Sequence, residues 1–216
     1  RIVDTLAPKG QPSPLLQAIQ ELQRRGGVVA GTSAGAAVMS TVMFRDAPLV
    51  TSVLKGQLRA GVEFDRGLGF AGPEIFIDQH FLKRGRVGRM IPLMLAQNYT
   101  LGVGVDENSA VLIQGNTLEV VGGRGALVVD LHEAHSNSHH GALEVRGARL
   151  SYLEPGDRFD RQTRQVLPLQ AKLSNPLSSS ASTPEPPFEY DRYFMDILGD
   201  TAIVNAMIHL VEGSRQ

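Results

Sequence analysis

The spacing of apolar positions predicts where the first elements of the chain lie. Apolar residues at helical spacing predict an amphipathic helix over residues 13–25, with Ser13 as its cap and Pro14 at its first position. Two glycines end this helix, and a short β-branched strand at 28–30 follows them. Small residues over 34–43 then return to helical spacing. The order is therefore helix, buried strand, tight turn and helix.

The spacing of apolar residues also predicts strands and a helix in the middle of the chain. Further strands are predicted at residues 75–77, 101–105, 110–113, 117–121, 126–130 and within 142–152, with a second helix at 86–97. The three strands between 110 and 130 have the turns of a meander. Short apolar strands that alternate with helices are typical of a parallel sheet. We expect an α/β fold whose mostly parallel sheet is flanked by helices.

The composition changes after about residue 165. A catalytic α/β domain is predicted over residues 1–165, followed by a Ser/Pro-rich linker over 166–190. Apolar residues at helical spacing then predict a helical extension over 191–216.

Composition and charge exclude several classes of function. The 216 residues are 42% hydrophobic and 20% charged, with a formal net charge of −1. No basic field favours nucleic acid, and no apolar run is long enough to span a bilayer. There is no cysteine, which excludes disulfides, thiolate catalysis and Cys-ligated zinc. We therefore expect neither a nucleic-acid partner nor a membrane partner.

A glycine-flanked serine is the main candidate for chemistry. Ser33 lies in a Gly-x-Ser-x-Gly segment between the predicted strand and the next helix. In a nucleophile elbow such glycines allow strand and helix to approach closely, while the serine protrudes from a strained turn. The backbone N–H of Ala34 at the start of the helix can then hold a developing oxyanion. A structural turn is the alternative interpretation.

A base must take the proton of such a serine, and His80 is the best placed of six histidines. It directly follows the strand at 75–77, where loops at strand carboxyl ends form ligand crevices. His132, His135, His139 and His140 fall in a polar stretch that reads as a solvated hairpin loop rather than a metal site.

A carboxylate should orient the imidazole and stabilise its charged form. Asp106 and Glu107 follow the strand at 101–105 as His80 follows its own strand, and spacing does not choose between them. The resulting order of serine, histidine and acid along the chain counts against an ordinary α/β-hydrolase esterase.

Three segments resemble the cyanophycinases, a family of serine peptidases related to dipeptidase E. They are residues 31–40 (GTSAGAAVMS), 78–89 (DQHFLKRGRVGR) and 102–107 (GVGVDE). The resemblance covers about residues 1–165 and implies a fold similar to class I glutamine amidotransferases. That amidotransferase chemistry uses a cysteine nucleophile, which this chain lacks.

The resemblance also assigns roles to residues. It implies Ser33 as nucleophile, His80 as general base and Glu107, rather than Asp106, as the triad carboxylate. It matches Asp78, Gln79, Arg84, Arg86 and Arg89 to a substrate pocket for cyanophycin, an aspartate backbone that carries arginine on each side-chain carboxyl and yields β-Asp-Arg dipeptides. Guanidiniums suit the free carboxylates of those arginine branches. No metal or organic cofactor is expected, because acyl transfer to water needs none.

Other expectations follow from the same resemblance. The family has a glycine-rich strand and loop upstream of the position that matches Arg1, so we expect a further N-terminal segment or a second chain to supply the first strands. A homo-oligomer is a further partner that we consider. An aspartyl dipeptidase of the dipeptidase E type and a non-catalytic peptide-binding member are the alternative functions. Sequence leaves the compartment undecided, with the cytoplasm favoured over export.

Overall fold

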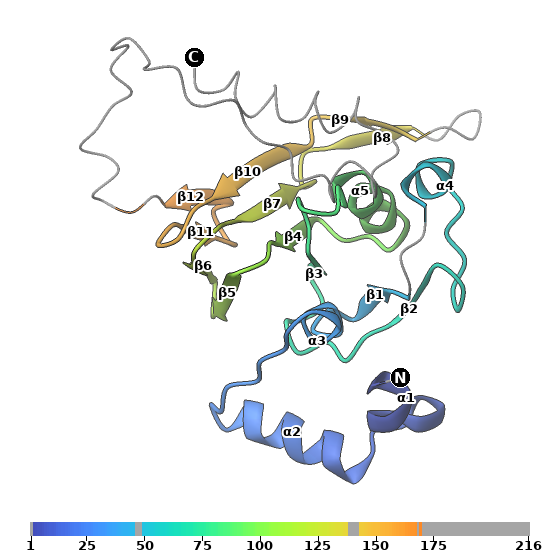
Figure 1. The fold of residues 1–216 in the computed structure, drawn as a ribbon, viewed down its shortest axis with the longest axis vertical. Coiled ribbons are helices and arrows are strands. Elements are labelled where there is room, and N and C mark those ends of the chain that lie inside the picture. The colour runs from blue at the N-terminus through green and yellow to red at the C-terminus, as the bar shows by residue number, and fades with distance from the viewer. Residues whose placement is uncertain (1, 46–48, 138–142, 168, 170–216) are drawn as a thin grey trace.

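The N-terminal part of the chain is helical and lies at one end of the molecule (Figure 1). The computed structural model describes residues 2–45, 49–137, 143–167 and 169. Helix α1 (Ile2–Leu6) and a 3-10 turn (Pro8–Gly10) precede α2 (Pro14–Arg24), which confirms the first predicted helix. Its cap is also as expected, because Ser13 Oγ accepts a hydrogen bond from the Leu16 N–H at 3.2 Å.

Two predictions around Ser33 are wrong. Residues 28–30 form no strand and pair with none in the described part of the chain, and Val28 is 87% exposed. The following helix, α3, spans only Ala34–Ala37, and the end of the predicted helix is a strand, β1 (Val42–Phe44). β1 pairs antiparallel with β2 (Phe64–Arg66), and the buried Ser40 Oγ accepts from the Ile77 N–H at 2.6 Å. These tertiary hydrogen bonds override a weak local helix propensity.

The first four-stranded sheet has the order β10-β7-β4-β3. Its strands are β3 (Ile75–Gln79), β4 (Leu101–Val105), β7 (Ala126–Asp130) and β10 (Arg149–Leu153). Only β3 and β4 are parallel; the other two pairs are antiparallel. The expectation of a mostly parallel sheet is therefore wrong for the described strands. A helical crossover, α5 (Val87–Ala96), joins β3 to β4, whereas the described residues between the later strands contain no helix.

A second four-stranded sheet is antiparallel throughout, with the order β12-β11-β6-β5. It contains β5 (Ser109–Gln114), β6 (Thr117–Gly122), β11 (Arg158–Asp160) and β12 (Gln165–Leu167). The predicted meander is thus divided, because β7 leaves it and pairs with β4. Strand β12 reaches into the start of the predicted linker. Most of that linker and the whole helical extension lie outside the described residues.

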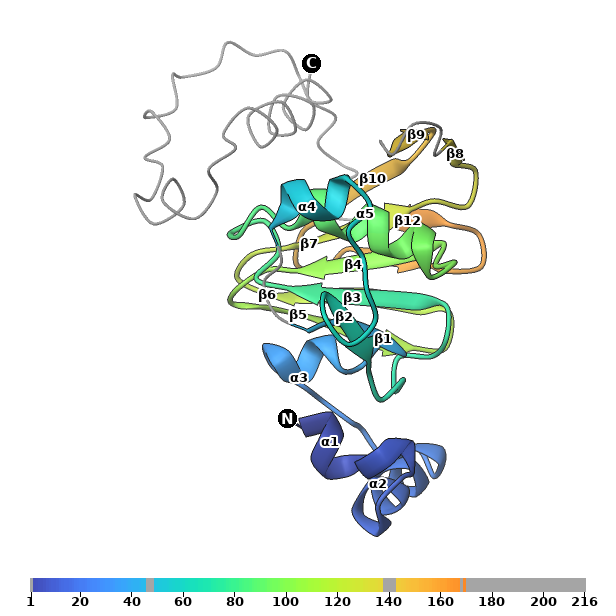
Figure 2. The same cartoon turned by 90° about the vertical axis from the view of Figure 1, so that its right-hand side faces the viewer.

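Strands β3, β4 and β7 of the first sheet are buried on both faces. On one side, Phe76 and Val129 pack with Met90 and Leu93 of α5, while helix α4 (Val50–Leu54) packs on α5 in turn. On the other side, buried residues of β3, β4 and β7 pack against Leu118, Val120 and Phe159 of the second sheet. The described residues therefore form an α/β fold with α5, the first sheet and the second sheet in successive layers, seen from the side in Figure 1 and with α5 in front in Figure 2. A small hairpin, β8 (His135–Asn137) with β9 (Glu144–Arg146), extends from it.

Candidate active site

The parallel pair β3 and β4 brings two predicted residues to the same edge of the first sheet. Gln79 and Val105 are partners at the carboxyl ends of these strands. His80 directly follows β3, and Glu107 lies two residues beyond β4. Because parallel strands end on the same side, their loops form a shared crevice.

Ser33 enters this region from the start of α3 on a strained turn. Its backbone has φ 53° and ψ −119°, a conformation that non-glycine residues rarely adopt. Gly31 makes the turn possible, because a Cβ on it would lie 2.1 Å from the carbonyl oxygen of Gly35. His80 also has a positive φ, of 49°. Two strained residues therefore meet at one place, and such strain tends to gather at functional sites.

The three side chains form a continuous line of hydrogen bonds. Ser33 Oγ lies 3.1 Å from His80 Nε2, and His80 Nδ1 lies 2.9 Å from Glu107 Oε1. A neutral imidazole that donates from Nδ1 to the carboxylate leaves Nε2 free to accept the serine proton. Ser33 is exposed, whereas the side chains of His80 and Glu107 are 23% and 31% exposed. The Ser33 hydroxyl is therefore open to solvent, while the Glu107 carboxylate binds the imidazole on the side away from the serine.

Glu107 is bound through both of its carboxylate oxygens. Oε1 contacts the imidazole, and Oε2 accepts a hydrogen bond from Lys83 Nζ at 2.8 Å. The Lys83 ammonium first, and then the His80 ring, hold the pKa of Glu107 below its usual range. Glu107 is thus kept ionised, which is the state that an imidazole partner needs. Lys83 was not among the residues expected from the sequence.

Asp106, the other acid considered, faces the loop after β3. Its Oδ1 accepts hydrogen bonds from the backbone N–H of Leu82 at 2.9 Å and of Lys83 at 3.3 Å. Burial raises the pKa of this carboxyl, although the two amides act against that effect. Asp106 therefore fixes the path of the chain beside His80, and Glu107 is the acid that contacts the ring.

Asp78 and two of the predicted pocket arginines form a buried ionic cluster. Arg89 binds both oxygens of Asp78 through Nε at 2.8 Å and a terminal nitrogen at 2.6 Å, and it lies 4.2 Å from the centre of the Phe44 ring. Arg86 donates to the carbonyl oxygen of Gln79 at 2.7 Å and to Asp78 at 3.4 Å. The three side chains are at most 7% exposed.

This burial changes what the two arginines can do. Desolvation, and then repulsion from Arg89, lowers the pKa of Arg86 to about 10, so it stays charged at neutral pH. Because both guanidiniums already bind protein oxygens, they are poorly available to a substrate carboxylate. They instead hold the end of β3 directly before His80.

The remaining predicted residues lie nearer to solvent. Arg84 is exposed, and so is Ala34, whose N–H begins helix α3. Gln79 is half-buried, and its Oε1 is buried without a hydrogen-bond partner among the described residues. An unpaired buried acceptor is uncommon and often has a functional explanation.

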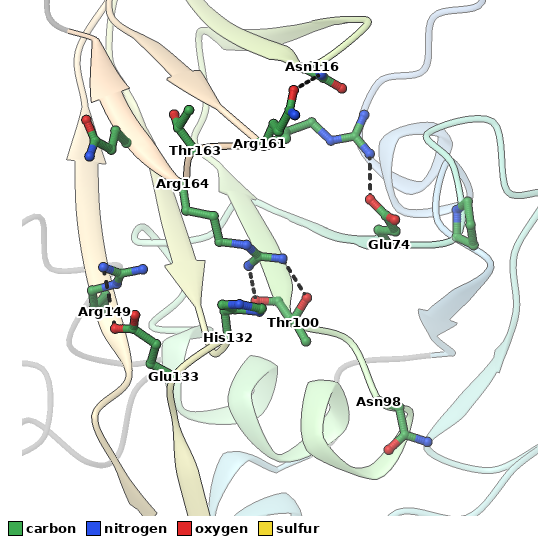
Figure 3. Close-up of a pocket in the computed structure, with 13 residues that line it drawn as sticks. Glu74, Asn98, Thr100, Asn116, His132, Glu133, Arg149, Arg161, Thr163 and Arg164 are labelled. Atoms are coloured by element: carbon green, nitrogen blue, oxygen red, sulfur yellow. Dashed lines mark hydrogen bonds and ion pairs between the residues drawn. The ribbon is translucent and has the colours of Figure 1, made fainter.

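A polar groove of about 1010 Å³ lies at the opposite end of the same strands (Figure 3). Glu74 precedes β3 and Thr100 precedes β4, so this groove is separated from His80 by the length of the sheet. Arg164 binds the Thr100 hydroxyl at 2.9 Å and Asp130 at 2.7 Å, and Arg161 pairs with Glu74 at 3.2 Å. These contacts fasten the turn between β11 and β12 to the first sheet. The groove contains none of the predicted site residues.

A serine hydroxyl, an imidazole and a carboxylate in sequence form the arrangement that serine hydrolases use. Comparison with known protein families points to the same class of enzyme, because the family model for peptidase family S51 matches residues 6–121. The chain belongs to peptidase family S51.

Curated relatives give a more particular likeness. Proteins named cyanophycinase from Trichormus variabilis and from Nostoc sp. are each 38% identical over 172 residues, which is 76% of this chain and 55% of theirs. A cyanophycinase from Geminocystis herdmanii is 34% identical over 72% of this chain and 58% of its own length. The chain thus spans a little over half the length of these relatives. A solved peptidase from an acI-B1 Actinobacterium is 23% identical with a TM-score of 0.48, over 72% of this chain and 54% of that one.

Among the described residues, no helix has the length and apolar character needed to cross a membrane.

Proposed function

We propose that Ser33, His80 and Glu107 are the nucleophile, general base and orienting acid of a serine peptidase. The observation that carries this proposal is the line of two hydrogen bonds from the Ser33 hydroxyl through the imidazole to the carboxylate, at 3.1 and 2.9 Å. Membership of peptidase family S51 supports the same class of reaction. The strained backbone of Ser33 supports a nucleophile elbow, as the glycine-flanked motif predicts.

The geometry allows each step of acyl transfer to be assigned. Ser33 Oγ attacks the peptide carbonyl carbon while its proton passes to His80 Nε2, and a tetrahedral oxyanion forms. The Ala34 N–H donates to this oxyanion, and Glu107 stabilises the imidazolium. As the C–N bond breaks, His80 returns the proton to the leaving amine. Water then attacks the acyl-Ser33 ester with His80 again as base, which releases the acid and restores the serine.

We further propose cyanophycin as the substrate, with release of β-Asp-Arg dipeptides. Three curated relatives named cyanophycinase, at 34 to 38% identity, support this choice. Arg84 is the predicted pocket arginine that remains exposed, so it is the one we assign to a substrate carboxylate. Gln79 is the half-buried predicted pocket residue directly before His80, and Asp78, Arg86 and Arg89 hold the end of β3 beside it.

Covalent labelling tests the reaction class. A phosphonofluoridate reacts when Ser33 Oγ attacks phosphorus, fluoride leaves and His80 accepts the proton. The full chain should be labelled at Ser33, and Ser33→Ala should not be labelled there. If the folded protein with Ser33 intact is not labelled, a non-catalytic peptide-binding role is favoured instead.

Substrate comparison then tests the choice of substrate. The proposal predicts release of β-Asp-Arg from cyanophycin that stops in Ser33→Ala. If the labelled protein instead hydrolyses Asp-X dipeptides and leaves cyanophycin intact, an aspartyl dipeptidase of the dipeptidase E type is the correct assignment.

A further inference from the structure

Lys83 contacts the far side of the proposed triad, where it binds the carboxylate that orients the imidazole. Its ammonium donates to Glu107 Oε2 at 2.8 Å, while Glu107 Oε1 faces His80 at 2.9 Å. A carboxylate held at only one oxygen can rotate and exchange its two oxygens. With both oxygens bound, the plane of the Glu107 carboxylate is fixed, and so is the direction from which it meets the ring.

Lys83 is itself held by the acid that neighbours Glu107. The backbone N–H of Lys83 and that of Leu82 both donate to Asp106 Oδ1. Two adjacent acids after β4 therefore bind the loop after β3. The Asp106 carboxylate binds backbone amides of this loop, and the Glu107 carboxylate binds the Lys83 side chain. This double attachment ties the loop that begins with His80 to the strand that ends with Glu107.

Phe81 adds an apolar contact to the same loop. It is fully buried, and it packs so closely on β4 that a Cβ on Gly104 would lie 2.0 Å from its ring. The backbone around Lys83 is thus packed in place, whereas the lysine side chain, 37% exposed, extends to the surface. Removing the ammonium should therefore change the triad without unfolding the loop.

We propose that Lys83 is a positioning residue for catalysis, which holds the Glu107 carboxylate in line with His80. This inference rests on the proposed function, because it gives Lys83 a role only if Glu107 orients a catalytic imidazole. An opposing effect exists, since the ammonium also repels the positive charge that His80 gains during the reaction. The direct 2.8 Å bond to Glu107 outweighs it, because the carboxylate lies between the ammonium and the ring.

The test compares Lys83→Met, Lys83→Arg and the exposed control Lys55→Met in the full chain. The rate of Ser33 labelling by a phosphonofluoridate should fall about five-fold in Lys83→Met, the upper range for a partly exposed ion pair. Lys83→Arg should recover most of this loss because it retains the charge, and Lys55→Met should match the unmodified protein. Urea midpoints report whether each variant is folded.

Two further readouts separate positioning from a merely structural role. Added salt should slow the unmodified protein towards the rate of Lys83→Met and leave that variant nearly unchanged, because salt screens an exposed pair. The acid limb of the labelling rate should move to higher pH in Lys83→Met, because loss of a positive charge beside the triad makes it easier for the triad to take up a proton.

The outcomes also separate this inference from the proposal on which it rests. If the unmodified protein is not labelled, the proposed function fails and this inference fails with it. If it is labelled, and Lys83→Met reacts as fast or faster, only the role of Lys83 is overturned. A slower Lys83→Met variant with unchanged salt and pH responses also overturns it, since the lysine would then act on structure alone.

Discussion

The two glycines around Ser33 should respond in opposite ways to the same substitution. Gly31→Ala places a Cβ 2.1 Å from the carbonyl oxygen of Gly35 and 2.6 Å from the Met39 side chain. Two of the atoms it meets belong to backbone, so the turn itself must shift by about 1 Å to restore ordinary contact distances. At Gly35, by contrast, an added Cβ meets nothing within 4 Å.

The size of each effect follows from these contacts. Overpacking of this kind costs about 1–3 kcal/mol of folding free energy, and a misplacement of about 1 Å costs about 100-fold in rate. Gly35 lies in helix α3 with a negative φ, so Gly35→Ala should stabilise the protein by about 0.5–1 kcal/mol and should leave the rate near normal.

The assay combines urea unfolding with the rate of Ser33 labelling, and Gly35→Ala serves as the matched control for Gly31→Ala. Equal labelling rates for Gly31→Ala and the unmodified protein would refute the claim that the close approach of Gly31 to Gly35 positions the serine. A large loss in Gly35→Ala would refute it as well, since the structure leaves open space there.

Three further predictions follow from the ionic contacts. Asp78→Asn should lower the free energy of unfolding by about 3–5 kcal/mol, because it weakens the pairing of two buried guanidiniums. The control Glu119→Gln, in a partly exposed pair with Arg158, should lower it by less than about 1 kcal/mol. Equal urea midpoints for the two variants would contradict the prediction. Burial acts to raise the pKa of Asp130, but the His132 amide and two arginines hold it below the usual range. The ionised Asp130 therefore contributes to the free energy of unfolding above its unfolded pKa of about 3.9, and this contribution is lost as pH falls through its pKa in the folded protein. Acid unfolding should accordingly be less steep in Asp130→Asn. Glu107→Gln should lower the labelling rate by up to about 10⁴-fold with little change in the urea midpoint, and a rate within two-fold of normal would exclude its role.

Short-range patterns predicted the elements that carry His80 and Glu107. The apolar runs at residues 75–77 and 101–105 are strands β3 and β4, and the helical spacing at 86–97 is helix α5. A helix between two buried strands is enough to make them parallel, so their loops were expected to meet. The arrangement of the later strands could not be inferred locally, because β7 pairs with β4 and β10 rather than with its neighbour in sequence.

The site was predicted in outline, but side-chain partners depend on tertiary packing. Spacing left Asp106 and Glu107 as equal candidates, and only the fold places one against loop amides and the other against the ring. The resemblance assigns Arg86 and Arg89 to a substrate pocket, yet Asp78 lies eleven residues or fewer away and binds both in the core. Lys83 carried no motif of its own. Its position three residues after His80 is the one signal that could have indicated it.

The most direct test of the account is a double-mutant cycle on the two groups behind the serine. Labelling rates of Ser33 would be measured in His80→Ala, in Glu107→Gln and in the protein that carries both changes. Because Glu107 acts through the imidazole, the double variant should react no more slowly than His80→Ala alone. If the two losses multiply instead, the carboxylate and the imidazole act independently, and Ser33, His80 and Glu107 are not one catalytic unit.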